Sequence, residues 1–464
     1  MNSKKKIHFE VSERKILLRL FDVFSVLLSL YLVGIIFNFK YFYITVYNYQ
    51  WTVVLGTYIL LIGSVFEMYN LQVASNQFQA IRSIILTSFT TVIVYLFTPI
   101  LTPELPSNRI QIVYFFVAIF VALLIWRMFY QKYLASHRFE KKVILVCESE
   151  QADELIQGLK SIDPHYTIIA LVDAEYGESR SIPNSSIQMV PLAKLERFVS
   201  QNSISEIVVA TQKTEAITVD LYNKLLLLLE NGFTIREYTH VYENLTQRIP
   251  VQYVAQDFYR YFPFSRSNQN QLYLLLIRLF DIVIALVGIG VGMALLPFLF
   301  VGNLIGNRGK MFYTQVRVGQ NGKDFRIIKF RTMVKNAEQH GAVFATANDV
   351  RITPFGKFLR KTRIDEFPQF LNILMGEMAV IGPRPERPVF VNEIAEVMPF
   401  YQTRHVIKPG LTGWAQVNYS YGDSIDDSLI KLQYDLYYIK HRSIFLDINI
   451  LIKTLSTILF YRGQ

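Results

Sequence analysis

Four long apolar runs fill the first third of the chain, and each is close to the length that a helix needs to cross a bilayer. They lie at residues 20–37, 51–66, 84–101 and 112–128, and about 17–25 residues span the hydrocarbon core. Asp22 is the one acid within them, and its place near the end of the first helix predicts that it reaches the lipid headgroups. No small-residue cleavage site follows the first run, which argues against a removed signal peptide. The pattern predicts a bundle of four transmembrane helices rather than the core helices of a soluble protein.

Basic residues flank this bundle at both ends and are scarce in its loops. Six Lys/Arg precede the first apolar run and five lie at or after the end of the fourth, whereas the loops at 38–50 and 102–111 hold only Lys40 and Arg109. Basic flanks stay on the cytoplasmic side of a membrane. Both ends of the bundle are therefore predicted to be cytoplasmic.

A second domain is predicted at residues 140–262, where short β-rich runs alternate with helical patterns. Strands are expected at 143–147, 168–172 and 204–210, and helices at 150–162, 192–201 and 219–231. This alternation is typical of a parallel sheet with crossover helices. The turn after the first strand, Glu-Ser-Glu-Gln, has no glycine, although a dinucleotide fingerprint needs glycines beside the pyrophosphate. The domain is predicted to be Rossmann-like, with a structural or regulatory role rather than a bound cofactor.

A fifth apolar segment, residues 272–300, is long enough to cross the membrane but is followed by a basic block. Residues 302–363 contain 13 Lys/Arg and three acids, and a crossing would place them outside the cell against the positive-inside rule. Pro297 lacks an amide hydrogen and interrupts the helical ladder. We expect a re-entrant helix–break–helix hairpin on the cytoplasmic face, with Arg278 and Asp281 at the interface. The alternative is a true fifth span with an external tail.

The composition excludes several classes of protein. Hydrophobic residues make up 52% of the 464 residues and charged residues 18%, which is typical of a protein that lies partly in lipid. Cys147 is the single cysteine, so neither an intrachain disulfide nor a thiolate metal cluster can form. The net charge of +10 suits nucleic acid, an anionic membrane surface or phosphorylated substrates, and alone does not choose among them.

The last 160 residues contain segments whose charges suggest chemistry. Asp365 and Glu366 follow three cations, at 360, 361 and 363, so a carboxylate stays ionised there. Carboxylate oxygens are ligands that Mg²⁺ prefers beside substrate phosphates, and a carboxylate can also attack phosphorus. Arg384 lies between two prolines, and its planar fork can bind phosphate through two hydrogen bonds. Together these residues predict a phosphoryl-transfer site, although each alone could be a helix cap, a rigid turn or a solvated basic face.

Four segments, taken as a set and in this order, resemble the bacterial sugar transferases, which are polyprenyl-phosphate hexose-1-phosphate transferases. They read Lys-Phe-Arg-Thr-Met at 329–333, Asp-Glu-Phe-Pro-Gln at 365–369, Gly-Pro-Arg-Pro-Glu at 382–386 and Pro-Gly-Leu-Thr-Gly-Trp-Ala-Gln-Val at 409–417. The resemblance departs at the helix break, where Leu-Pro replaces the usual Ser-Pro, and at Gly-Lys-Met-Phe-Tyr, where the family usually has Gly-Pro-Val-Phe-Phe.

This resemblance implies a membrane α + α/β protein like the large members of the family. Residues 1–139 would form the four-helix transmembrane domain, 140–262 the Rossmann-like cytoplasmic domain, and 263–464 the monotopic catalytic domain with its re-entrant helix. The protein would be a multi-pass protein of the bacterial inner membrane with its catalytic domain on the cytoplasmic face. It would catalyse the first membrane step of exopolysaccharide, capsule or O-antigen assembly.

The reaction that the resemblance implies is the transfer of hexose 1-phosphate from a UDP-hexose to undecaprenyl phosphate with Mg²⁺, releasing UMP. Glucose or galactose is favoured, and an N-acetylated sugar stays open. Asp365 would be the nucleophile, and Glu366 would join it as a metal ligand. The implied substrate-binding residues are Arg360, Arg384, Lys329, Arg331, Pro383, Glu386 and Gln416. The partners would be both substrates and membrane lipid, not nucleic acid, and a homodimer is compatible with the pattern.

Two other function classes are compatible with parts of the chain. One is a membrane scaffold or regulator with an inert transferase-like part, which the intact set of charged residues argues against. The other is a UDP-sugar dehydratase or dehydrogenase acting through the middle domain, which the missing glycines argue against.

The apolar stretch at 444–461 is predicted to be an interfacial helix or a packed core helix.

Overall fold

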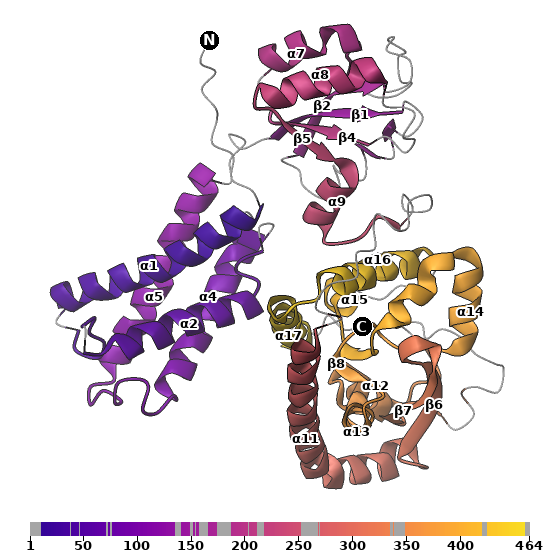
Figure 1. The fold of residues 1–464 in the computed structure, drawn as a ribbon. Coiled ribbons are helices and arrows are strands. Elements are labelled where there is room, and N and C mark those ends of the chain that lie inside the picture. Colours follow the sequence, from indigo (N-terminus) through magenta and orange to yellow (C-terminus); the bar gives the residue numbers. More distant parts are fainter. Residues whose placement is uncertain are drawn as a thin grey trace. The chain divides into compact units, whose positions relative to one another are not determined.

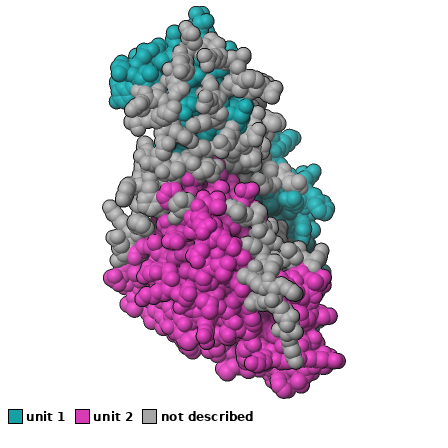
Figure 2. Space-filling model, turned by 90° about the vertical axis from the view of Figure 1, so that its right-hand side faces the viewer, with its two compact units in different colours: residues 1–241 teal, residues 242–464 magenta. Residues whose placement is uncertain are grey.

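A computed structural model describes most of the chain and divides it into two compact units, Met1–Val241 and Tyr242–Gln464 (Figure 2). The described residues are 11–37, 39–45, 47–70, 73–74, 77–134, 141–148, 152–153, 155–156, 166–173, 187–202, 204–210, 218–251, 268, 270–334, 337, 349–419 and 425–459. The domain boundaries predicted at 139–140 and 262–263 lie outside these residues.

The first unit begins with four apolar helices. They are α1 (Val11–Phe37), α2 (Tyr49–Val65), α4 (Gln77–Leu96) and α5 (Ile110–Phe129) (Figure 1). Among the described residues of this unit, the segments Glu13–Phe37, Gln77–Leu96 and Ile110–Tyr133 are long and apolar enough to cross a membrane, and α2 has 17 residues. Phe115 is fully buried in the shared core, in ring contact with four aromatic side chains. The prediction of four apolar helices is confirmed.

Asp22 forms a buried ion pair inside this bundle. Its Oδ2 is 3.0 Å from Nη2 of Arg127, and the two side chains are 0% and 2% exposed. The helix begins at Val11, well before the apolar run, so Asp22 lies deep within it. A buried carboxylate is stabilised beside a cation, and α5 supplies Arg127. The prediction that Asp22 reaches the lipid headgroups is therefore wrong.

A parallel sheet completes the first unit. Its strands are β1 (Lys141–Cys147), β2 (Tyr166–Asp173), β3 (Gln188–Met189), β4 (Glu206–Val209) and β5 (Thr234–Glu237), in the order β3-β2-β1-β4-β5. All four neighbouring pairs are parallel, with α7 (Leu195–Gln201) and α8 (Val219–Glu230) among the connections. The predicted parallel sheet is confirmed, whereas β3 and β5 were missed because such short polar strands show no apolar run. The helix predicted at 150–162 falls largely outside the described residues.

The second unit is built around a long apolar helix, α11 (Gln271–Gly302), which runs on into the π-helical turn η8 (Asn303–Asn307). Pro297 lies inside the helix, and the helical segment bends toward its C-terminal end (Figure 1), as helices that contain proline do. Arg308 ends the turn in the left-handed conformation. The helix thus continues through Pro297, where a break was expected, and it bends instead of breaking. The re-entrant path through a membrane stays a prediction.

Two side chains tie α11 to the rest of this unit. Arg278 donates to the carbonyl oxygens of Ile373 and Leu374, at 2.7 and 2.8 Å. Asp281, which is 3% exposed, accepts from the backbone amide of Val380 at 2.8 Å. The helix is therefore held by charged hydrogen bonds as well as by apolar packing.

The described residues of the second unit form a main apolar core, which includes Trp414, and a smaller apolar cluster around Leu299, Phe330 and Leu359. Besides α11, this unit contains β6 (Phe312–Val318), η9 (Gln320–Gly322), β7 (Asp324–Phe330), α12 (Pro354–Lys361), η10 (Ile364–Glu366), α13 (Gln369–Met375), β8 (Ala379–Ile381), α14 (Pro388–Val397), η11 (Pro399–Val406), β9 (Gly410–Thr412), α15 (Trp414–Asn418), α16 (Ile425–His441) and α17 (Ile444–Leu459). Helix α9 (Tyr238–Thr246) begins at the end of the first unit and ends in the second. Trp414, Ile373 and Leu432 are at most 1% exposed in the main core. α17 buries Ile450 and leaves Phe445 86% exposed, so it has both a packed face and a free apolar face.

We expect substitution of one partner of the Asp22–Arg127 pair to destabilise the bundle. Asp22→Asn leaves a buried guanidinium without its counter-charge, and breaking a buried pair in this way costs about 3–5 kcal/mol. The double variant Asp22→Leu/Arg127→Met removes both charges and should recover most of the loss. The measurement is the thermal unfolding midpoint of the full-length protein in detergent, with exposed Arg109→Gln as control. Wild-type stability of Asp22→Asn would contradict the role of the pair.

Candidate active site

The acidic pair lies in a short turn between two helices. α12 ends just before it, η10 contains it and α13 follows. Arg363 adopts the left-handed conformation with φ 58°, which turns the chain between α12 and η10. Asp365 and Glu366 are 7% and 8% exposed. Two adjacent carboxylates are thus buried together, and such charges persist only with compensating partners.

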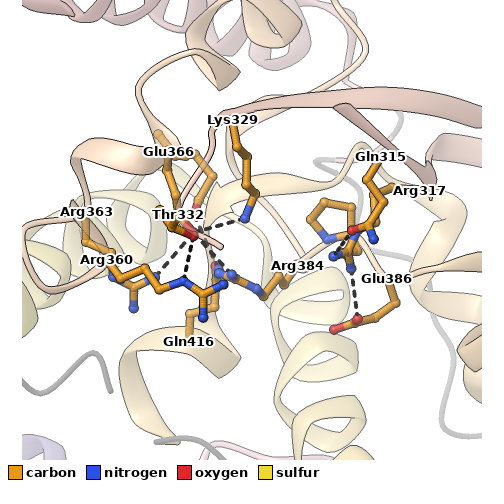
Figure 3. A network of polar contacts seen from close by, with 12 residues as sticks. Gln315, Arg317, Lys329, Thr332, Arg360, Arg363, Glu366, Arg384, Glu386 and Gln416 are labelled. Carbon is orange, nitrogen blue, oxygen red and sulfur yellow. Dashed lines mark hydrogen bonds and ion pairs between the residues drawn. The ribbon is translucent and has the colours of Figure 1, made fainter. Parts of the chain in front are cut away.

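Glu366 is surrounded by cations. Its Oε1 lies 3.1 Å from Nη2 of Arg384, 3.4 Å from Nη1 of Arg363 and 3.6 Å from Nζ of Lys329 (Figure 3). Burial raises the pKa of Glu366, but these three cations outweigh burial and lower the pKa to about 2. Glu366 is therefore ionised at neutral pH, and its role is to hold positive groups together.

Asp365 has a different environment. Its Oδ1 is buried, and none of the residues that the structure describes forms a hydrogen bond with this atom. Burial and the negative charge of Glu366 raise the pKa of Asp365 to about 6, while Lys329 and nearby arginines oppose the rise. Adjacent carboxylates with separated pKa values can take separate roles. Asp365 is the one with an oxygen free to meet a ligand.

The first basic segment is divided between two places. Lys329, on β7, faces Glu366, and burial lowers the pKa of its ammonium group to about 8. Arg331 instead donates through Nη2 to the carbonyl oxygen of Asn307 at 2.9 Å. Together with Asn303, Arg331 lines a small cavity at the end of the membrane helix segment. The structure therefore brings Lys329 to the acidic pair and places Arg331 in a different setting.

Arg360 is positioned by a hydroxyl group. Its Nε donates to Oγ1 of Thr332 at 3.0 Å, and Figure 3 shows it beside the Glu366 cluster. Its positive charge lowers the pKa of Asp365. Arg360 is thus close enough to the nucleophile candidate to influence it electrostatically without forming an ion pair with Glu366.

The other three predicted residues each have a protein partner, which for Gln416 is the carbonyl oxygen of Leu411, 3.4 Å from its Nε2. The carbonyl oxygen of Pro383 accepts from the Gly410 amide at 2.9 Å. Glu386 pairs with Arg317 at 3.3 Å, on the other side of Arg384 from Glu366 (Figure 3). Gln416 lies below Arg384 in the same view, and its Oε1 is buried without a hydrogen-bond partner among the described residues.

Four side chains in this network (Figure 3) were absent from the predicted site residues: Arg363, Thr332, Arg317 and Gln315, which accepts a hydrogen bond from Arg317. Arg363 could have been found, since it lies three positions before Glu366 and belongs to the same basic run. Thr332 lies within the Lys-Phe-Arg-Thr-Met segment, but its role depends on Arg360, 28 positions later. Arg317 had no local signal, because its partner Glu386 is 69 positions away.

The carboxylates fit a magnesium ion that is bound together with substrate phosphate. Mg²⁺ commonly takes one or two carboxylates and completes its shell with water and phosphate oxygens. The unpartnered Oδ1 of Asp365 is such a donor, whereas Oε1 of Glu366 already faces three cations. Within the described ranges, no group of three or more His, Cys, Asp and Glu side chains gathers to hold a metal ion. Asp365 is the better of the two predicted ligands.

Two family models match the chain. Residues 272–461 match the model described as bacterial sugar transferase, and this range includes all of α11 but its first residue, the acidic pair and every predicted site residue. Residues 64–225 match the model described as CoA-binding domain. That second range spans α4 and α5 as well as much of the parallel sheet.

Three relatives show how far the similarity extends. A UDP-N-acetylgalactosamine-undecaprenyl-phosphate N-acetylgalactosaminephosphotransferase of Aeromonas hydrophila is 42% identical over 217 residues, 47% of this chain and 50% of that protein. A putative undecaprenyl-phosphate N-acetylgalactosaminyl 1-phosphate transferase of Bacillus subtilis is 41% identical over 141 residues, 30% of this chain and 79% of that protein. A galactosyl transferase of Streptococcus agalactiae is 26% identical over 372 residues, 72% of this chain and 76% of that protein. The match thus spans half the length of the Aeromonas protein.

We expect the two carboxylates to have opposite effects on stability at pH 7. The folded-state pKa of Asp365 is raised to about 6, so its contribution favours folding at low pH and is lost as the pH rises through 6. Asp365→Asn should therefore stabilise the protein by about 1–3 kcal/mol at pH 7. The pKa of Glu366 is lowered to about 2, so Glu366→Gln should destabilise at pH 7, with a difference that narrows as the pH falls below 4.5 toward 2.

The measurement is the thermal unfolding midpoint of the full-length protein in detergent with a metal chelator present. Asp324→Asn, an exposed acid on β7, is the control and should leave the midpoint unchanged. Destabilisation by Asp365→Asn as large as that by Glu366→Gln would contradict the division between the two groups.

Proposed function

Because this chain belongs to the bacterial sugar transferase family, we propose that it transfers a sugar 1-phosphate from a UDP-sugar to undecaprenyl phosphate and releases UMP. The observation that carries this proposal is the environment of Asp365. A buried carboxylate oxygen without a hydrogen-bond partner among the described residues lies next to a charged Glu366 and several cations. That arrangement suits attack on a phosphate whose negative charge must be neutralised.

In the first step, a carboxylate oxygen of Asp365 attacks the phosphorus atom that bears the sugar. The bond between this phosphorus and the bridging oxygen breaks, and UMP leaves with the electron pair. The product on the enzyme is an acyl phosphate ester between Asp365 and the sugar phosphate. Ionised Asp365 is required, because a protonated carboxyl group is a poor nucleophile.

In the second step, a phosphate oxygen of undecaprenyl phosphate attacks the same phosphorus atom. The bond to Asp365 breaks, the carboxylate is regenerated, and undecaprenyl-diphosphate-sugar is the product. Arg360 and Arg384 supply positive charge to the transferring phosphate in both steps. Lys329 and Arg363 keep Glu366 paired. A magnesium ion on Asp365 and substrate oxygens would add charge neutralisation.

The membrane solves a problem of encounter between the two substrates. The UDP-sugar is soluble in water, whereas the acceptor phosphate is attached to a long lipid chain. The chain is a membrane protein with four candidate spans among the residues that the structure describes, and α11 joins the catalytic elements through Arg278 and Asp281. We place the catalytic unit on the cytoplasmic face of the bacterial inner membrane, where the reaction would start assembly of a surface polysaccharide.

The most detailed part of the proposal is the identity of the transferred sugar. Two of the three relatives are named for N-acetylgalactosamine and the third for galactose. Glucose or galactose, which the sequence resemblance favoured, therefore share the proposal with N-acetylgalactosamine. The substrate class is a UDP-linked hexose or N-acetylhexosamine.

Asp365→Asn should abolish transfer. Loss of a covalent nucleophile typically lowers turnover by about 10³-fold or more, and Asp324→Asn should retain wild-type activity. The measurement is UMP release by the full-length protein in detergent, with undecaprenyl phosphate and each of UDP-glucose, UDP-galactose, UDP-N-acetylglucosamine and UDP-N-acetylgalactosamine. Digestion after incubation without acceptor should yield a peptide around Asp365 that carries the mass of a sugar phosphate. Wild-type turnover by Asp365→Asn would refute the assigned nucleophile.

The pH profile should be bell-shaped. Activity should rise through about pH 6 as Asp365 loses its proton, and fall above about pH 8 as Lys329 loses its charge. Lys329→Arg keeps the positive charge at high pH and should move the alkaline limb upward. Lys323→Arg, an exposed lysine before β7, should leave both limbs in place, and an alkaline limb that does not respond to Lys329→Arg argues against this assignment.

A further inference from the structure

Arg384 lies in a connecting segment whose place in the unit is set by contacts with other elements. Residues 383–387 connect β8 to α14 without helical or strand hydrogen bonding. Pro383 and Pro385 flank Arg384 and have no amide hydrogen to donate. The position of Arg384 must therefore depend on contacts from other parts of the unit.

Arg317 supplies one set of these contacts. Its Nη1 donates to the carbonyl oxygen of Pro385 at 3.1 Å and to Oε2 of Glu386 at 3.3 Å. Its Nη2 donates to Oε1 of Gln315 at 2.7 Å. The next residue of β6, Val318, donates its amide to the carbonyl oxygen of Glu386 at 2.9 Å. Strand β6 thus binds the two residues that directly follow Arg384.

Arg404 holds the turn at the neighbouring residue. Its Nη2 donates to the carbonyl oxygen of Arg384 at 2.9 Å. Arg404 is 4% exposed, pairs with Asp435 at 2.7 Å and donates to the hydroxyl of Tyr401 at 2.6 Å. Two guanidinium groups from separate elements therefore bind two consecutive carbonyl oxygens, those of residues 384 and 385.

This arrangement concentrates positive charge around one turn. Burial lowers the pKa of Arg317, and the positive charges of Arg384 and Arg387 lower it further, whereas Glu386 raises it. An apolar side chain could fill the same volume without this repulsion. What an apolar side chain lacks is the ability to donate to Pro385 and Glu386 at the same time.

We propose that Arg317 is a positioning residue for sugar-phosphate transfer, acting through Arg384. By holding Pro385 and Glu386, it keeps the Arg384 guanidinium 3.1 Å from Oε1 of Glu366, on the side where the substrate phosphate would bind. Arg317 itself lies on the other side of Arg384 and points toward Glu386 (Figure 3). The proposal rests on the proposed function, because its effect is exerted on the same reaction.

A double-mutant cycle on the full-length protein in detergent tests this dependence. We measure kcat/KM for UMP release by the wild type, Arg317→Met, Arg384→Met and the double variant. Arg384→Met should lose about 10²–10³-fold, as when one group that stabilises transition-state charge is removed. Arg317→Met should lose about 10-fold or more. The double variant should be no worse than Arg384→Met alone, since Arg317 then has nothing left to position.

Arg326→Met is the matched control. Arg326 lies on β7 next to β6, opposite Val316, and its side chain is exposed. It should retain wild-type kcat/KM. Arg317→Lys keeps the positive charge but cannot bind Pro385, Glu386 and Gln315 through one planar guanidinium group. Its loss of kcat/KM should therefore be nearly as large as that of Arg317→Met. If Arg317→Met does not fold, Arg317→Lys takes its place in the double-mutant cycle.

The kinetic parameter that changes separates positioning from general support. Because Arg317 is proposed to act through Arg384, Arg317→Met and Arg384→Met should change the same parameter, either kcat or KM for the UDP-sugar. Multiplicative losses in the double variant, or a loss in Arg317→Met that falls on the other parameter, would overturn the proposal, while wild-type UMP release left the proposed function intact.

If the wild type releases no UMP, the proposal can still be tested by a measurement that does not depend on activity. Thermal unfolding of Arg317→Met, Glu366→Gln and their combination reports whether the two sites are coupled. Less than additive destabilisation supports the positioning link, and full additivity overturns it.

Discussion

The buried negative charge of Glu366 is the constraint on which the site depends. A carboxylate that is only 8% exposed needs cations close by, and three of them come from different parts of the chain. Lys329 comes from β7, Arg363 from the turn after α12, and Arg384 from the turn after β8. Because all three meet at one oxygen, the strand, the turn and the loop are held in one arrangement.

This charge balance also gives the neighbouring Asp365 its character. Glu366 takes the ion pairs, so Asp365 keeps a buried oxygen that no described residue engages. Its pKa rises because water is excluded and a negative group is adjacent. In this environment the ionised carboxylate of Asp365 is poorly stabilised while no substrate is bound. This favours its reaction with an incoming phosphorus atom or its coordination of a cation.

The membrane helix and the acidic turn are packed together closely enough to act as one piece. An added Cβ at Gly288 would lie 2.4 Å from the ring of Phe370, and one at Gly302 would lie 2.3 Å from the ring of Phe355. Phe370 belongs to α13, which follows the acidic pair, and Phe355 belongs to α12, which precedes it. Glycine on α11 thus allows both helices that flank Asp365 and Glu366 to contact it.

Much of the architecture was readable from local patterns. Apolar runs predicted the helices of the bundle, alternating runs predicted the parallel sheet, and the clustered segments pointed to residues that include Lys329, Glu366 and Arg384. Strand β5 (Thr234–Glu237) escaped because its residues are mostly polar and become a strand only by pairing with β4. The bend of α11 replaced the predicted break, since helical geometry persists through Pro297.

Sequence alone determined which residue types were available and which segments are apolar enough to form membrane helices, because hydrophobicity and charge act over a few turns of helix. Tertiary structure decided the partners: Asp22 with Arg127, Arg331 with Asn307, Glu386 with Arg317. The two residues of each pair are far apart along the chain, and only the fold brings them together. A charged side chain takes the nearest partner in space when it is buried, and spacing along the chain does not reveal which partner that is.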